Sequence, residues 1–144
     1  MSWADTQAVV AAIQQVPAVA DSTFPVLAPV QPELQPLPYV VVFPSDGVDT
    51  ADRVTGPRVS EHPAFTLHVV GSSANQTQVV TGLIKALFVT GGRFIPPAVE
   101  GRRNSRGYWR SPIPLQTDTD VDPALIYQVI ELGWVSEPAP VIAP

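Results

Sequence analysis

The chain has 144 residues and a formal net charge of −5, and only 15% of its residues are charged, whereas 17 are prolines. A chain of this length buries roughly two-thirds of the surface of its unfolded state, so we expect one folded domain over residues 1–137. The absence of cysteine excludes disulfides and cysteine-based metal sites. No apolar run approaches the ~20 residues that a membrane helix needs, and the acidic start lacks the basic region of a secretory signal, so we expect a soluble protein.

The first forty residues predict a helix followed by an extended arm. Trp3, Val10 and Ile13 share one face of an amphipathic helix over residues 2–16, which ends where the first proline follows. Six prolines between residues 17 and 38 oppose both a helix and the interior of a sheet. We therefore expect a partly polyproline arm, which either lies across its own subunit or crosses to a neighbouring one.

The centre of the chain carries the clearest pattern. Tyr39–Phe43 is a continuous apolar run that predicts a strand buried on both faces. A long connection follows over residues 45–63, with a short β extension expected around residues 53–60. In residues 64–70 apolar and polar positions then alternate, which predicts a strand with Phe65, Leu67 and Val69 on its buried face.

A helix is predicted directly after this strand. Ser73 and Gln76 form a capping box at its start, and Gly91 with Gly92 is expected to end it as a glycine C-cap. The helical spacing assigns the buried face to Val79, Val80, Leu83, Ile84, Leu87 and Phe88, and the solvent face to Gln78, Thr81 and Lys85.

The last third predicts a hairpin, a long strand and a tail. Strand-forming residues over 94–109 surround Asn104–Gly107, which we interpret as the tip of a hairpin. Residues 124–135 alternate as a central strand, and the proline-rich residues 138–144 are expected to form a flexible tail. The predicted fold class is therefore α+β, with a small mixed or antiparallel sheet packed against two helices and proline-rich arms.

Charge is distributed unevenly along the chain. Five of the eight basic residues gather in one stretch that contains a single acid, and they are Arg93, Arg102, Arg103, Arg106 and Arg110. An acidic stretch follows, with Asp118, Asp120 and Asp122. We interpret both as candidate contacts to a partner, and the arginines either lie in solvent or meet an acidic rim or passing DNA. The aspartates either are solvated or pair with arginines, with a divalent ion as the alternative.

No catalytic constellation is evident in the sequence. His68 lies on a strand and has a structural interpretation, and two histidines without cysteine do not make a zinc site. Ser73 lies where a nucleophile elbow would place its serine, but Asn75 replaces the required glycine and helix capping explains the serine. We therefore expect no enzyme activity, no cofactor and no metal.

The order of elements, together with four stretches, resembles the tail terminator proteins of long-tailed phages, especially those that infect actinobacteria. The stretches are YVVVFPSDG, FTLHVVGSSANQTQVVTGLIKALF, the arginine-rich segment and DTDVDPALIYQVIELGWVSEP. The resemblance covers residues 1–137 and is most specific in the acidic lead into the last strand. The proline-rich residues 17–38 depart from a minimal version of the pattern.

This resemblance implies a structural virion protein of the tail or neck, assembled in the host cytoplasm. It implies a homo-oligomeric ring, a hexamer, that caps the tail tube, stops its polymerisation and joins it to the head connector. DNA would pass through the ring without sequence-specific binding. The contact residues expected for this role are Arg102, Arg103, Arg106, Arg110, Asp118 and Asp120. Another neck component, such as a connector or tail-completion protein, and a small-molecule-binding domain or weak hydrolase are the alternatives.

Overall fold

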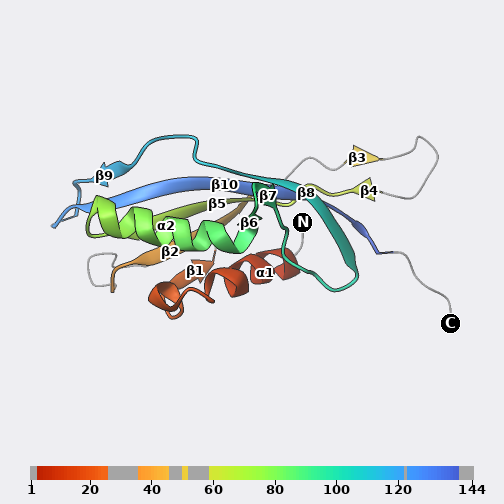
Figure 1. Cartoon of the computed structure of the whole chain (residues 1–144), viewed down its shortest axis with the longest axis horizontal. Helices are drawn as coiled ribbons and strands as arrows, with labels where there is room; N and C mark the ends of the chain where they lie inside the picture. Colours follow the sequence, from red (N-terminus) through yellow and green to blue (C-terminus); the bar gives the residue numbers. More distant parts are fainter. Residues whose placement is uncertain (1–2, 26–35, 46–49, 52–58, 122, 140–144) are drawn as a thin grey trace.

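The computed structural model describes residues 3–25, 36–45, 50–51, 59–121 and 123–139, and Figure 1 shows their arrangement. Two α-helices, one short 3₁₀ helix and ten strands occur in these ranges. In chain order they are α1 (Trp3–Ile13), η1 (Pro17–Val19), β1 (Thr23–Pro25), β2 (Tyr39–Ser45), β3 (Thr50–Ala51), β4 (Val59–Ser60), β5 (Ala64–Gly71), α2 (Ala74–Phe88), β6 (Val89–Thr90), β7 (Arg93–Phe94), β8 (Arg102–Arg110), β9 (Gln116–Asp118) and β10 (Leu125–Pro138).

One mixed sheet with the order β1-β2-β5-β10-β8 forms the body of the protein. The strand β1 pairs with β2 in parallel, and the other neighbours are antiparallel. The strand β10 pairs with β5 on one side and with both β9 and β8 on the other, so β9 and β8 follow one another along the same edge. Figure 1 shows β10 running almost the full length of the molecule, with β9 at one end and β3 and β4 at the other.

The two faces of this sheet differ in what covers them. One face carries the main core, in which apolar residues of β2, β5 and β10 pack against α1 and α2. The other face carries a smaller cluster built from strand and loop residues of the described chain, without a helix residue. The predicted α+β class, with two helices against a mixed sheet, is confirmed.

The alternation predicted for the strands holds. Phe65, Leu67 and Val69 belong to the helix-covered core, and His68 lies on the opposite face. The run at β2 is buried on both faces, as predicted, and β10 is a central strand that continues to Pro138. The part of the predicted tail beyond residue 139 lies outside the described residues.

The segment predicted as an extended arm has more structure than its prolines suggest. Pro17 begins η1, where a fixed φ suits the first helical position, and Pro25 ends β1. Because β1 is an edge strand, the missing N–H of its proline does not interrupt the sheet. The edge position of β1 agrees with the prediction that these prolines oppose the interior of a sheet, but η1 and the pairing of β1 with β2 show that residues 17–25 are not simply an extended arm. Residues 26–35 lie outside the described residues.

The helix α2 begins as predicted, but its buried face is rotated from the predicted one. The side chain of Ser73 accepts a hydrogen bond from the Gln76 N–H at 3.1 Å. Val79 and Leu83 are about half exposed, at 53% and 50%, whereas Thr81 is buried, so these three assignments are wrong. The buried side chains are Thr77, Val80, Thr81, Ile84 and Phe88. Threonine hydroxyls can lie inside because each donates to a carbonyl one helical turn earlier.

Two further corrections concern turns. Gly91 and Gly92 both have positive φ, 58° and 77°, but they form the turn of the β6–β7 hairpin, so they are not a helix C-cap. The predicted tip Asn104–Gly107 is also wrong, because β8 is one continuous strand paired with β10.

In α1, Trp3 is 55% exposed, so it does not share the buried face with Ile13.

Candidate assembly surface

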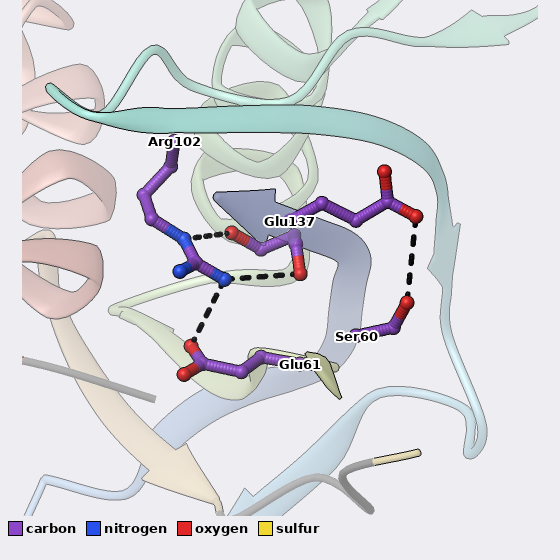
Figure 2. Close-up of polar contacts among 5 residues, drawn as sticks. Ser60, Glu61, Arg102 and Glu137 are labelled. Carbon is purple, nitrogen blue, oxygen red and sulfur yellow. Dashed lines mark hydrogen bonds and ion pairs between the residues drawn. The ribbon is translucent and has the colours of Figure 1, made fainter. Parts of the chain in front are cut away.

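Four of the five arginines of the basic stretch lie on the edge strand β8, and Arg93 lies on β7. Arg102 is the most enclosed of the arginines on β8. Its Nε donates to Ser136 Oγ at 2.9 Å, and its Nη2 donates to the Ser136 carbonyl at 3.1 Å. The same Nη2 lies 3.5 Å from a carboxylate oxygen of Glu61 (Figure 2). Because Ser136 is fully buried, this guanidinium satisfies polar atoms that water does not reach. Arg102 therefore helps to hold the paired ends of β8 and β10 together.

Two other arginines of β8 also meet acids of the same chain. Arg103 contacts Glu137 at 3.1 Å, and Arg110 contacts Glu131 at 2.6 Å. The Arg110 guanidinium also lies 5.1 Å from the centre of the Tyr108 ring. Both arginine side chains remain about two-thirds exposed, so these pairs are screened by water and contribute little to folding.

Arg106 differs from its neighbours in backbone and in partners. The ladder to β10 shifts here, because Gly107 is opposite Trp134 and Ser105 is opposite Val135. Arg106 is therefore the extra residue of a β-bulge, with an unusual positive φ of 30°. Within the described part of the chain, its exposed guanidinium has no ion pair or hydrogen bond.

A shallow hollow of about 330 Å³ lies beside this bulge. Its lining combines one cation with aromatic and small apolar groups, namely His62, Pro63, Ala64, Arg106, Tyr108, Trp134 and Val135. Bulges turn side chains away from the regular pleat, and a strained non-glycine backbone indicates that the surrounding structure holds it. The bulge thus presents one free guanidinium at the edge of the sheet.

A larger hollow, of about 500 Å³, lies on the sheet face that has no helix. Its floor comes from alternate residues of three strands, and its rim comes from β9 and the loop after it. The lining residues are Tyr39, Val41, Phe43, His68, Val70, Thr117, Asp118, Thr119, Asp120, Leu125 and Tyr127. We call it the acidic groove. The sequence indicated its two carboxylates, but not the aromatic floor that the sheet register brings to them.

The rings of the floor are packed against one another. His68 is stacked on Tyr127 with centroids 5.5 Å apart, and its other contact is an edge-on one with Phe43 at 5.0 Å. Burial lowers the pKa of His68, so this ring is neutral at pH 7. Burial, together with the nearby charge of Asp118, raises the pKa of Tyr39. The floor is therefore uncharged at neutral pH, and the rim is negative.

Of the two rim carboxylates, that of Asp118 is held by a local hydrogen bond. Asp118 Oδ1 accepts a hydrogen bond from the Asp120 backbone N–H at 3.0 Å, which fixes the turn after β9. Neither carboxylate pairs with a cation in the described part of the chain, and no cluster of metal-binding side chains was found there. Asp122, the third predicted member, lies outside the described residues.

The outer surface of the helices is nearly uncharged. Among the exposed positions of α1 and α2, Lys85 alone carries a charge, and Val79 and Leu83 lie one turn apart in the same exposed region. Solvent-facing helices normally carry many charged residues. None of the helices described is long and apolar enough to span a membrane.

Ser73 is occupied with capping α2, and no base accompanies it in the contacts of the described residues.

No protein-family model matches the chain, and no curated protein matches it. Nine chains of solved structures match it. The chain is similar to a chain of the structure titled "Virion of native gene transfer agent (GTA) particle", with a TM-score of 0.56 and 18% identity. The match covers 94% of this chain and 99% of that chain.

Proposed function

We propose that this protein is a structural component of a phage-type virion. The observation that carries the proposal is the fold likeness to a chain of the gene transfer agent virion, which extends over nearly the full length of both chains. Fold alone does not define function, so the surface must support the same conclusion. The nearly uncharged helix surface and the half-exposed Val79 and Leu83 are typical of a face that is covered in an assembly.

Within the virion, the role that we propose is that of a tail terminator. A ring of identical subunits, a hexamer, would cap the tail tube protein, end its polymerisation and offer its other side to the head–tail connector. The net charge of −5 suits a ring through which DNA passes without sequence-specific binding, because an acidic lumen does not hold the phosphate backbone.

Electron microscopy of polymerising tail tube protein, with and without this chain, tests the proposed role. We expect the added protein to shorten the tubes and to leave one extra ring at an end. Unchanged tubes together with binding to the head connector would instead indicate another neck component. Binding to neither would refute the virion proposal and direct attention to a small-molecule ligand of the acidic groove. A Ser73→Ala variant serves as a control, because a capping serine should affect stability and leave tube length unchanged.

A further inference from the structure

The acidic groove has the features of a site for a guanidinium group. Its floor includes the aromatic side chains of Tyr39, His68 and Tyr127, and a cation that lies over a tyrosine ring is attracted by that ring. Its rim offers Asp118 and Asp120, and carboxylates form the strongest hydrogen bonds to arginine. His68 is neutral at pH 7 and adds no repulsion to an incoming cation. The groove thus fits an arginine side chain better than a lysine or an anion.

The chain itself carries an arginine that fits this description. Three arginines of β8 are engaged with acids of their own chain, and Arg106 is the one that has no acidic partner among the described residues. Arg106 is opposite the Trp134–Val135 step of β10, whereas Asp118 is opposite Leu125. At ~3.3 Å per strand residue, these points are roughly 30 Å apart along one edge. The guanidinium of Arg106 therefore cannot reach the groove of its own subunit.

We propose that Arg106 of one subunit inserts into the acidic groove of a second copy of this chain. This inference rests on the proposed function to the extent that the chain assembles with itself, and it names the contact that joins neighbours. Of the six contact residues expected from the sequence, this inference keeps Arg106, Asp118 and Asp120. Arg102, Arg103 and Arg110 act within the subunit instead. Arg106, Asp118 and Asp120 have no ion pair in the described part of the chain, and charge complementarity between this cation and these two carboxylates is what selects a second copy as the occupant.

Disulfide trapping tests the contact without removing the charges that drive it. The chain has no cysteine, so a Ser105→Cys, Thr119→Cys variant carries one thiol beside Arg106 and one on the rim of the groove. These two positions cannot join within one subunit, because a disulfide requires Cα atoms closer than about 7 Å. We expect mild oxidation to cross-link separate chains. The absence of any cross-linked species at high protein concentration would overturn the inference.

Charge reversal supplies the specificity control. In the two-cysteine background, Arg106→Glu should lower the cross-linking yield by about tenfold or more. Arg93→Glu is the matched control, because Arg93 is also exposed and has no ion pair in the described chain. It should leave the yield unchanged. Equal losses in both variants would overturn the inference, because they would indicate a general effect of charge. Adding Asp120→Arg to the Arg106→Glu variant should restore the yield.

The size of the cross-linked products separates this inference from the proposed ring. A ladder that ends at one closed species supports both the contact and the ring. Products that stop at the dimer support the Arg106 contact and refute the ring, because a two-fold pair would then satisfy both grooves. Conversely, shortened tubes without any cross-link would support the terminator role and refute this contact.

Discussion

Replacing Arg102 with methionine should destabilise the protein by about 3 kcal/mol. The substitution keeps the aliphatic stem and removes two hydrogen bonds to the fully buried Ser136, at 2.9 and 3.1 Å, together with the 3.5 Å contact to Glu61. A hydrogen bond to a charged group contributes roughly 1.5–3 kcal/mol. We take less than the full sum because both bonds share one side chain, which is 23% exposed.

Arg103 provides the matched comparison on the same strand. It also has an acidic partner at 3.1 Å, but its side chain is 66% exposed, and Arg103→Met should cost less than about 1 kcal/mol. Urea unfolding measures both variants, with a slope of about 2 kcal/mol per molar assumed for a domain of this size. The midpoint should then fall by about 1.5 M for Arg102→Met and by less than about 0.5 M for Arg103→Met.

The reasoning would be refuted if the two variants lost equal stability, or if Arg102→Met unfolded at the midpoint of the unmodified protein. An Arg102→Lys variant adds a check on geometry. It keeps the charge but not the planar fork of donors, so it should recover only part of the lost stability. Full recovery would mean that charge near Glu61 matters more than the hydrogen bonds to Ser136.

Three further predictions follow from the packing. Because burial lowers the pKa of His68, the stability that the neutral ring provides is complete above the unfolded pKa of about 6.5 and is lost as the pH falls. Urea unfolding at several pH values should therefore show that His68→Phe loses less free energy of unfolding between pH 7 and 5 than the unmodified protein does. Gly107→Ala would place a Cβ 2.2 Å from the Phe94 ring and should cost about 1–3 kcal/mol of stability. In Gly82→Ala the new Cβ meets nothing within 4 Å, so this variant should stabilise α2 by up to about 1 kcal/mol. Shifts of the melting temperature measure both changes. Leu83→Glu alters an exposed position, so it should change the free energy of unfolding by less than about 0.5 kcal/mol and yet abolish tube capping in electron microscopy; unchanged capping would show that the helix surface is not covered.

Local patterns in the sequence were sufficient for β2, β5 and β10 and for the start of α2. Alternation identified Phe65, Leu67 and Val69 as core, and the capping signal at Ser73 fixed where the helix begins. The buried face predicted from hydrophobicity was wrong, because a threonine such as Thr77 can be buried. Its single hydroxyl proton is shared between the Ser73 carbonyl, at 2.9 Å, and the Ile126 carbonyl of β10, at 3.2 Å. That second bond depends on tertiary structure, which helical periodicity does not contain.

The proposed contact residues were also predictable only in part from the sequence. Charge along the chain pointed to the arginines and aspartates, but not to which arginines are already engaged. Arg102 and Arg103 are adjacent in sequence and have opposite surroundings, because β8 is a strand and its side chains alternate between faces. The bulge at Arg106, which separates it from its neighbours, has no signal in the sequence that we could identify beyond the glycine that follows.

The 14 residues of β10 also have a mechanical consequence. At ~3.3 Å per residue this strand is roughly 45 Å long, and the groove rim and the bulge are attached to it at different points. If neighbours pull on these two points, the load passes along one extended backbone and shears the ladders beside it. The β8 ladder is long, whereas β9 is held only through Gln116–Asp118. Under tension the acidic rim should therefore detach first, while the body of the sheet stays intact.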